Sequence, residues 1–362
     1  MNKPVVSIFV PAYNNPVYSK KTLQSIVEQN YRPIELLFLD DCSPTPLEPM
    51  VEEFRKYEGD DFIIRFFRHP VNLQGAGVDN TIFGFDHCTG KYIVNMPHDD
   101  WWTDRRFLSE AVGLMERNPE CHLCVANSIV ENTDGVTMIH LPKSMRNRDT
   151  WQILPGDVYI NMLGLDRIGY QAWSGIVFNL PMARSMGAFH YPFTLSTEEA
   201  NAFGMIPSDS FAFQFLLSSV GFVAITEKVV SVRGKPETSV CNITVKERRI
   251  PSAGQNAFVI HYNLYKADLN GKYAQAVKQR ARETIFHSPI AKINLKILKH
   301  YNYAIDACYL MLCSYLAGFF YYPRNYYWRL LCAIRDGEMP QLIAKQKARG
   351  LRGILRMIFP AN

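Results

Sequence analysis

The sequence predicts an α/β fold in which helices flank both faces of a mostly parallel β-sheet. Over about the first 130 residues, short apolar runs alternate with segments of helical spacing. The chain has 362 residues, of which 48% are hydrophobic, so it is long enough to bury a large core. Charged residues make up 20% and aromatic residues 13%, which is typical of a globular protein and excludes a disordered chain.

The predicted strands are short apolar runs, rich in β-branched and aromatic residues, that end at polar or turn residues. They are residues 5–10 (stopped by Pro11), 34–39 (ended by Asp40-Asp41), 62–67, 92–96 and 121–130 (followed by a turn at Asp134-Gly135). Because helical segments separate these strands, they are expected to run parallel, with helices covering both faces.

The predicted helices have apolar residues three and four positions apart, and turn or capping residues mark their ends. They are residues 18–29, 46–57 (with Pro near its start), 76–88 (closed by Gly90) and 103–118 (capped by Thr103 and stopped by Pro119).

The second half of the chain is less regular. It holds a strand-like run at 170–180, a helix at 210–220 that ends at Gly221, and strands near 222–226 and 229–233. Beyond about residue 250 the chain looks helical and basic, with many aromatic residues. We therefore predict one domain at 1–250 and a helical C-terminal region at 251–362.

Three polar clusters follow predicted strands. They are Pro11-Ala12-Tyr13-Asn14, Asp40-Asp41 and His98-Asp99-Asp100. In open α/β sheets, ligands bind beyond the carboxyl ends of the strands. The three clusters are therefore expected to meet at one rim of the sheet and to form a ligand site.

Five sequence motifs resemble those of the family 2 glycosyltransferases, over roughly residues 5–235. They are Val-Ser-Ile-Phe-Val-Pro-Ala-Tyr-Asn (6–14), Leu-Asp-Asp-Cys-Ser (39–43), Asn72 with Gly75, Gly-Lys-Tyr-Ile (90–93) and His-Asp-Asp-Trp (98–101). Each motif is weak alone, and their order and spacing make the signal. The resemblance implies a GT-A fold, a nucleotide-sugar donor, usually a divalent cation, and inversion at the anomeric carbon.

The resemblance also implies which residues contact the donor. Tyr13 and Asn14 would lie against the base and the ribose, and Asp41 matches the family's carboxylate that binds the nucleobase. Asp40 lies beside it, and either carboxylate could instead only cap the segment that follows. Pro11 and Asn72 belong to the same donor motifs, and Asp99 would lie near the diphosphate.

Asp99 and Asp100 match the end of the family's D-x-D motif, which implies Mn²⁺ or Mg²⁺ bridging the donor phosphates. The chain departs from that pattern, because Pro97 stands at the first acidic position. Two interpretations of His98 remain open: a metal ligand, which would favour Mn²⁺, or a hydrogen-bonding loop residue.

The acceptor hydroxyl needs a general base, and Asp209 matches the family's acidic residue at a helix start. The same residue would also cap that helix. Glu198 and Glu199 are the reserve candidates, in the part of the chain expected to bind the acceptor.

Two further features are expected to complete the site. Trp173 would either stack on the acceptor sugar or pack in the core. Arg233 and Lys235 are expected on a loop after the last strand, where they would stabilise the departing diphosphate. A solvated surface pair is the alternative.

The eight cysteines are scattered, and no secretion signal is visible, so we expect reduced thiols in a cytosolic protein. Cys121 and Cys124 form a lone C-x-x-C in a predicted strand. Residues three apart in a strand face opposite sides, so we expect packed thiols and no metal site there.

The C-terminal region is basic. From Gly271 onward it has 15 Lys and Arg against 4 Asp and Glu, a net charge of +11, which leaves −6 for the first 270 residues. Apolar residues of 351–359 recur at helical spacing, and Lys345, Arg349, Arg352 and Arg356 line another face. This pattern predicts an amphipathic helix on the inner membrane surface; packing on the body of the protein is the alternative. Residues 304–322 would be a packed helix, a homodimer contact or a membrane element.

The predicted reaction is transfer of a sugar to an acceptor hydroxyl, with a lipid-linked surface polysaccharide as the expected acceptor. A nucleotidyltransferase is disfavoured because Pro11-Ala12-Tyr13-Asn14 is not a glycine-rich basic loop. A non-catalytic binding module on a degraded transferase scaffold has Pro97 as its support. No nucleic-acid-binding module is recognised.

Overall fold

The computed structural model describes residues 3–73, 77–132, 135–138, 150–159, 172–188, 214, 217–218 and 220–234, and the structural statements below concern these residues. The chain divides into two compact units, Met1–Ala281 and Arg282–Asn362, and every described residue lies in the first. The predicted boundary near residue 250 and the predicted helices beyond it lie outside the described residues.

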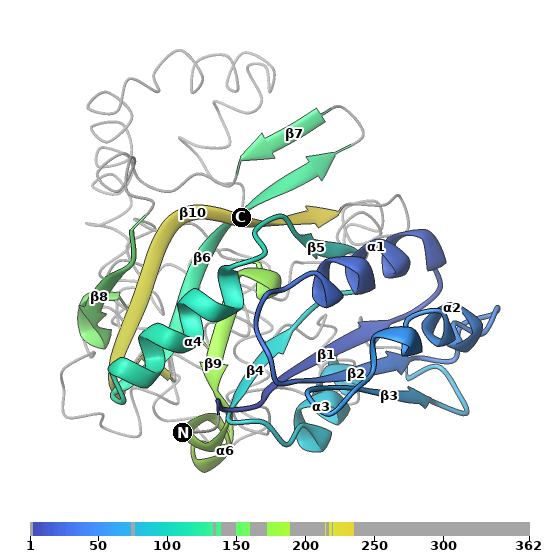
Figure 1. Cartoon of the computed structure of the whole chain (residues 1–362), viewed down its shortest axis with the longest axis horizontal. Coiled ribbons are helices and arrows are strands. Elements are labelled where there is room, and N and C mark those ends of the chain that lie inside the picture. The colour runs from blue at the N-terminus through green and yellow to red at the C-terminus, as the bar shows by residue number, and fades with distance from the viewer. Residues whose placement is uncertain are drawn as a thin grey trace, which may run out of the picture. The chain divides into compact units, whose positions relative to one another are not determined.

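The described strands form one mixed, mostly parallel sheet in the order β3-β2-β1-β4-β9-β6-β10-β5, with β7 paired to β6 and β8 to β10 (Figure 1). The strands are β1 (Val6–Ala12), β2 (Ile34–Asp40), β3 (Phe62–Arg68), β4 (Tyr92–Asn95), β5 (Asp100–Trp102), β6 (Cys121–Asn132), β7 (Gly135–Met138), β8 (Gln152–Pro155), β9 (Ile176–Asn179) and β10 (Phe222–Gly234). Strands β3, β2, β1 and β4 run parallel, as do β6 and β10, whereas β9 runs antiparallel between β4 and β6.

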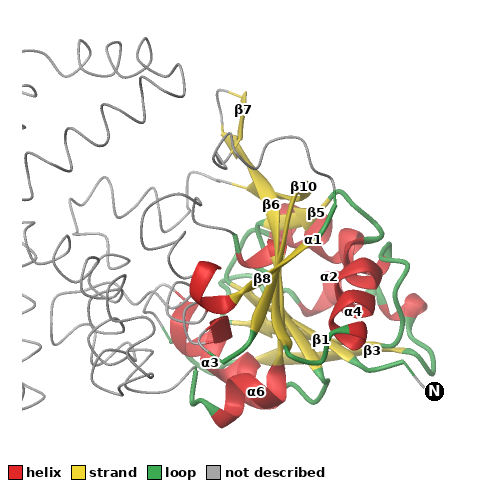
Figure 2. Ribbon diagram, turned by 90° about the vertical axis from the view of Figure 1, so that its left-hand side faces the viewer, coloured by secondary structure: helices red, strands yellow, loops and turns green. Residues whose placement is uncertain are grey.

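Helices flank both faces of this sheet, as predicted (Figure 2). They are α1 (Pro16–Val27), α2 (Glu48–Glu52), α3 (Val78–His87), α4 (Phe107–Arg117) and α6 (Leu180–Ser185), with short 3₁₀ helices η1 (Arg55–Tyr57) and η4 (Trp173–Gly175). Figure 2 shows α1, α2 and α4 on one face and α3 and α6 on the other. None of the described helices is long and apolar enough to cross a membrane.

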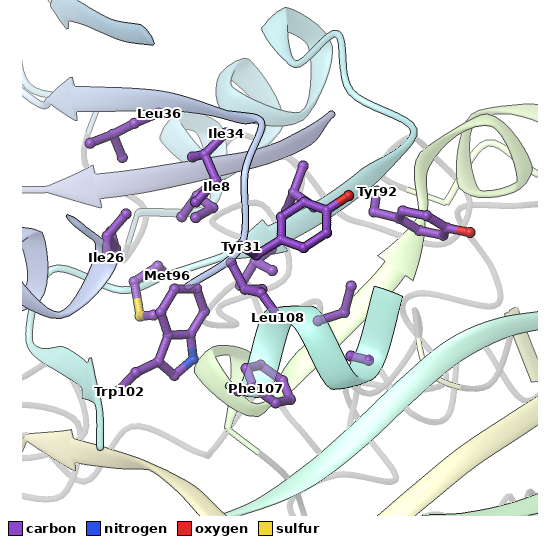
Figure 3. Packing of buried hydrophobic residues seen from close by; sticks show 14 of the residues in the cluster. Ile8, Ile26, Tyr31, Ile34, Leu36, Tyr92, Met96, Trp102, Phe107 and Leu108 are labelled. Carbon is purple, nitrogen blue, oxygen red and sulfur yellow. The ribbon is translucent and has the colours of Figure 1, made fainter. Parts of the chain in front are cut away.

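Each face of the sheet has its own hydrophobic cluster. The first joins residues of β1 and β2 to α1 and α4, and part of it is shown in Figure 3, including Ile8, Ile26 and Phe107. The second joins the opposite side of the same strands to α3 and α6, through residues such as Phe9 and Phe85. Successive residues of a strand face opposite sides, so Ile8 and Phe9 enter different clusters. A strand buried on both faces reads as a continuous apolar run, which is why these strands were visible in the sequence.

Three element predictions are wrong in detail. Strand β1 does not stop at Pro11 but pairs with β2 as far as Ala12. The segment 46–57 forms the short α2 and then η1. The two strands predicted near 222–226 and 229–233 are one strand, β10, with an irregularity between Ile225 and Val229.

Thr103 does not cap α4. The helix begins at Phe107 with Arg106 at its N-cap, and the backbone N–H of Thr103 donates to Val230 O at 2.9 Å. The chain before the helix is drawn into the sheet as β5, which pairs antiparallel with β10. Tertiary pairing thus overrides the local capping signal.

The face assignment of the two C-x-x-C thiols is also wrong. The register of β6 against β10 shifts between Cys121 and Leu123, and this bulge inserts one extra residue into the alternation. Cys121 and Cys124 therefore both enter the first cluster. The interpretation as packed thiols is confirmed, because both are buried and free.

Candidate functional site

The loops that follow β1 and β2 are tied together at the carboxyl rim of the sheet. The backbone N–H of Asp41 donates to Ala12 O at 2.8 Å, and the N–H of Asn14 donates to Ser43 Oγ at 2.7 Å. Asn14, Asn15 and Cys42 have positive φ angles of 56°, 64° and 55°, which bend both loops sharply. Asparagine tolerates this left-handed region better than most residues, whereas Cys42 is held there by the surrounding contacts.

Asp40 has the capping role that the sequence left open. Its carboxylate is fully buried and accepts hydrogen bonds from Ser43 N at 2.9 Å and Leu47 N at 3.3 Å. It also pairs with the Arg68 guanidinium. Both carboxylate oxygens are used inside the protein, so this position does not favour a donor contact, and that role of Asp40 stays a prediction.

Asp41 lies at the same rim and is also buried, but its hydrogen-bond partners differ from those of Asp40. One oxygen, Oδ1, accepts from Leu73 N at 2.8 Å, and the Asn72 amide Nδ2 donates to the backbone oxygen of Asp41 at 3.0 Å. Asn72 therefore positions Asp41. Burial raises the pKa of Asp41 above its usual range, although the hydrogen bond from Leu73 opposes the shift.

Tyr13 and Pro11 flank this pair of loops. Tyr13 is 45% exposed at the end of β1, where its ring is free to meet a planar ligand.

The oxygen of Pro11 lies 3.2 Å from Nδ1 of His98. A carbonyl only accepts, so Nδ1 carries the proton and Nε2 is left as the basic nitrogen. The prediction of a hydrogen-bonding role for His98 is compatible with a ligand role for Nε2.

Asp99 and Asp100 point to different environments. Asp99 is half-buried in the turn after β4, whereas Asp100 is 2% exposed and its Oδ2 accepts from Ser174 Oγ at 2.7 Å. Burial, and next the neighbouring Asp99, raise the pKa of Asp100 well above its usual range. Oδ1 of Asp100 has no hydrogen-bond partner in the part of the chain that the structure describes. A metal-ligand role for Asp100 stays a prediction, and its burial does not favour it.

Arg233 was predicted on a loop after the last strand, and this prediction is wrong. The residue lies inside β10. The strand continues because Arg233 is paired with Asp100 of β5 and with Val130 of β6. Its guanidinium acts on the Asp100 carboxyl electrostatically. A positive charge is thus placed beside the His98–Asp100 turn, where a diphosphate would need it.

Trp173 has the packing role that the sequence offered as one of two alternatives. It is half-buried in η4 and packs against the second cluster, with its ring centroid 6.4 Å from that of Phe178. The sugar-stacking role stays a prediction. Five predicted site residues lie outside the described residues: Gly75, Glu198, Glu199, Asp209 and Lys235.

One motif of the resemblance is structural. Gly90, the first residue of Gly-Lys-Tyr-Ile, lies so close to β1 that a Cβ there would be 2.6 Å from Val5 O. Its N–H donates to Ser7 Oγ at 2.8 Å. At this end of the sheet, opposite the rim, only glycine allows the approach.

The sequence reasoning missed three residues that fix the His98–Asp100 turn. They are Thr22 of α1, Ser174 of η4 and Gly234 of β10. A Cβ on Gly234 would lie 2.2 Å from Asp99 O. The available signal was weak: a hydroxyl at a core-facing helix position, and a glycine two residues after a strand-like apolar run.

A divalent cation would find a small set of donors here. Among the described residues, no group of three or more His, Cys, Asp or Glu side chains could hold a metal ion. Asp99 offers carboxylate oxygens, and His98 offers Nε2. One carboxylate and one imidazole fit a cation whose remaining ligands are phosphate oxygens and water.

Comparison with known proteins gives one family. The sequence model of Glycosyl transferase family 2 matches residues 7–168. TuaG of Bacillus subtilis, named as a teichuronic acid biosynthesis glycosyltransferase, is 27% identical over 153 residues, which are 41% of this chain and 57% of TuaG. WcaA of Escherichia coli, named as a colanic acid biosynthesis glycosyl transferase, is 27% identical over 107 residues, which are 29% of this chain and 36% of WcaA. The chain thus spans little more than half of one of these relatives and about a third of the other.

A solved structure shares the fold. Residues 1–349 of TarS from S. aureus, in complex with UDP-GlcNAc, match with a TM-score of 0.54 and 13% identity, over 83% of this chain and 88% of that one. The shared fold, the matched segment and the order of the rim motifs agree with one another. Residues 7–168 therefore match glycosyl transferase family 2, and the described part of the chain has a GT-A-like fold.

Proposed function

We propose that this chain transfers a sugar from a nucleoside-diphosphate donor to an acceptor hydroxyl, with inversion at the anomeric carbon. The observation that carries the proposal is the family match over residues 7–168, a segment that contains the rim residues Asp41 and Asp99. The matched segments span only part of the length of the relatives, so the activity of the protein is stated here as a proposal.

The rim residues would divide the donor between them. The buried Asp41 carboxylate, held by Leu73 N, accepts hydrogen bonds from the nucleobase, and Tyr13 lies against the plane of the base. Asp99 lies on the turn after β4 and Arg233 lies on β10, and the proposed diphosphate position is between them. A fixed positive charge beside the leaving group stabilises it as negative charge develops.

We propose that Asp99 and Nε2 of His98 hold a divalent cation, with Mn²⁺ favoured over Mg²⁺ because one ligand is nitrogen. When bound, the cation would neutralise the leaving diphosphate. His98 is oriented for this role by its Nδ1–H bond to Pro11 O. Metal-binding histidines usually donate their other N–H to such a partner.

The expected acceptor is a growing surface polysaccharide on a lipid carrier. The names of TuaG and WcaA, which refer to teichuronic acid and colanic acid biosynthesis, support this acceptor class. The basic C-terminal region would bring the enzyme to the inner membrane surface in the cytoplasm.

A thermal-shift screen tests donor binding. The purified protein is heated with UDP, GDP, dTDP or CMP, each with and without Mn²⁺ or Mg²⁺. UDP comes first because the TarS structure with the shared fold contains UDP-GlcNAc. A ligand that binds only the folded protein raises the melting temperature. One nucleotide with a metal-dependent shift is expected, and no shift with any of them would contradict the proposal.

The general base is tested by substitution. Asp209→Asn should abolish sugar transfer and leave the nucleotide-induced thermal shift unchanged, because the base acts on the acceptor and not on the donor. Sugar transfer is measured by the release of the nucleoside diphosphate. Glu198→Gln and Glu199→Gln are the comparison variants. Retained turnover in Asp209→Asn, with loss in one of the others, would move the base role there.

A second candidate function is a binding module without turnover. It is favoured by Pro97, which stands where the family has its first acidic residue. Such a protein would give the thermal shift, but it would not release the nucleotide from a sugar donor of any of the four classes.

A further inference from the structure

Thr22 lies beneath the turn that carries Asp99. It is on α1, its side chain is fully buried, and its Oγ1 lies 2.8 Å from His98 O and 2.6 Å from Asp100 O. The third neighbour of Oγ1 is Tyr18 O of its own helix, at 3.1 Å. One hydroxyl of α1 thus reaches the backbone on both sides of Asp99, 76 and 78 residues along the chain.

The Thr22 hydroxyl has fewer protons than the carbonyl oxygens around it could accept. A hydroxyl has one proton, and all three neighbours are carbonyl oxygens that only accept. The single O–H is therefore shared among three acceptors that converge on it. Its removal would leave the two turn carbonyls facing each other in a buried place without a donor. An unsatisfied buried carbonyl is costly, so the turn would have to move.

Besides the side-chain contacts of His98 with Pro11 O and of Asp100 with Ser174 Oγ, two backbone hydrogen bonds hold the turn. Asp100 N donates to Pro97 O at 3.0 Å and closes the turn, and Gly234 N donates to Asp99 O at 2.9 Å. Neither contact involves the oxygens of His98 or Asp100. Because Thr22 holds both of these oxygens, it sets the orientation of the peptides that flank Asp99.

We propose that Thr22 is a positioning residue for the donor site: it fixes the His98–Asp100 turn in the geometry that meets the cation and the diphosphate. This inference rests on the proposed function. Thr22 itself touches neither ligand and acts through the backbone of the turn.

Ser25 provides a matched control on the same helix. Its side chain is also buried, and its Oγ donates to the helix oxygen Thr22 O at 2.8 Å, without any contact with the turn. Thr22→Val and Ser25→Ala therefore each remove one buried hydroxyl from α1, and only the first removes a contact with the turn. Thr22→Ser keeps the hydroxyl, and Thr22→Ala leaves space in which a water, with two protons, can replace it.

The first measurement is hydrogen exchange of a peptide that contains residues 97–103. Thr22→Val should speed exchange of the Asp100 amide by about tenfold, the effect of losing one buried hydrogen bond. Ser25→Ala and Thr22→Ser should match the unsubstituted protein, and Thr22→Ala should lie between. Equal exchange in Thr22→Val and the unsubstituted protein would overturn the proposal.

The second measurement is binding of Mn²⁺ in the presence of the nucleotide that the thermal-shift screen selects. The electron paramagnetic resonance signal of free Mn²⁺ reports how much of the metal is bound. Thr22→Val should weaken binding by about tenfold, with recovery in Thr22→Ser and no change in Ser25→Ala. Faster exchange with unchanged binding would overturn the link between Thr22 and the donor site. Failure of the proposed function is seen separately, as absence of nucleotide binding by the unsubstituted protein, and the exchange result then decides whether Thr22 positions the turn.

Discussion

Asp40 and Asp41 are neighbours in the sequence, yet their carboxylates have different surroundings. Asp40 is enclosed by Ser43 N, Leu47 N and Arg68 and stabilises the loop after β2. Oδ1 of Asp41 accepts a hydrogen bond from the backbone N–H of Leu73. A single residue of offset at the end of a strand thus gives two neighbouring carboxylates different partners, and only Asp41 is proposed to bind the donor.

Asp41 predicts a pH dependence of donor binding. Burial raises its pKa, so on acidification it becomes neutral at a higher pH than an ordinary aspartate. If the ionised form binds the nucleobase, affinity should fall as the pH drops through this raised pKa. Asp41→Asn should bind about tenfold or more weakly at neutral pH, with little pH dependence, and should stay folded because the amide oxygen can still accept from Leu73 N.

Nucleotide titrations by calorimetry from pH 8 to pH 4 check this expectation. The control is Asp60→Asn, which removes an exposed carboxylate before β3, at the end of the sheet opposite the rim. Equal affinity of Asp41→Asn and the unsubstituted protein at every pH would show that Asp41 does not contact the base.

Gly234 predicts a steric effect on the Asp99 turn. A Cβ at this position would lie 2.2 Å from Asp99 O and 3.0 Å from Cε1 of Tyr18, so Gly234→Ala must push the turn away from β10. Overpacking of this kind costs about 1–3 kcal/mol. The melting temperature and the metal-dependent nucleotide affinity should both fall.

Gly113→Ala in α4 is the matched glycine control. A Cβ there would meet only the far end of Arg117, at 3.4 Å, and alanine favours a helix by about 1 kcal/mol over glycine. This variant should be as stable as the parent or more so. Unchanged nucleotide affinity in Gly234→Ala would argue against a role of the Asp99 turn in donor binding.

At the scale of elements, one buried carboxylate joins three parallel strands to the loop before β4. Glu35 of β2 accepts from Ser7 Oγ of β1 at 2.5 Å, from Arg65 of β3 at 2.9 Å and from Thr89 N at 2.9 Å. Burial alone would raise its pKa, but these hydrogen bonds outweigh burial and hold the pKa of Glu35 below its usual range. The network stabilises the amino end of the sheet, away from the rim.

Glu35 predicts a pH-dependent loss of stability. Since its folded pKa is lowered, its contribution is present above the pKa of the unfolded chain, about 4.3, and is lost as the pH falls through the lowered folded value. Glu35→Gln should reduce the free energy of unfolding by about 1–3 kcal/mol at pH 7, and the difference from the parent should shrink below about pH 4.3.

Urea unfolding of parent and variant at several pH values measures this difference. Glu53→Gln is the comparison, because Glu53 forms an exposed ion pair with Lys20 that is expected to contribute little. A difference between parent and Glu35→Gln that stays constant down to acid pH would contradict the assigned role.

At the scale of the whole molecule, charge is divided unevenly between the first 270 residues and the rest of the chain. The net charge of +11 from Gly271 onward predicts attraction to anionic lipids. Replacement of Arg349, Arg352 and Arg356 by Glu in the full chain should reduce sedimentation with anionic liposomes at least tenfold. About 1 kcal/mol is lost per basic residue near such a surface.

Replacement of Lys20, Arg105 and Arg106 by Glu is the control, because these exposed residues lie in the first unit. The same change in net charge should then affect sedimentation less. Equal loss in both triple variants would indicate a nonspecific charge effect, and no loss in either would exclude membrane docking through the predicted C-terminal helix.

The sequence by itself determined the fold class and the rim of the sheet at which the candidate site lies. Alternating apolar strands and amphipathic helices dictate a parallel sheet, and in such a sheet residues that follow different strands meet at one rim. This local logic places Tyr13, Asp41 and Asp99 together. It failed where pairing partners come from afar, as in β5, which forms only because β10 lies beside it.

Only the tertiary structure decided which carboxylates turn inward. Arg68 lies 28 residues from Asp40, and Ser174 lies 74 residues from Asp100, so no local pattern links either pair. The same holds for Thr22 beneath the Asp99 turn and for Gly234 against it. A buried charge or carbonyl needs a partner that is near in space, and that partner can be far away in the sequence. The motifs of the chain therefore indicate the candidate site, whereas tertiary packing decides which of its carboxylates are buried and paired.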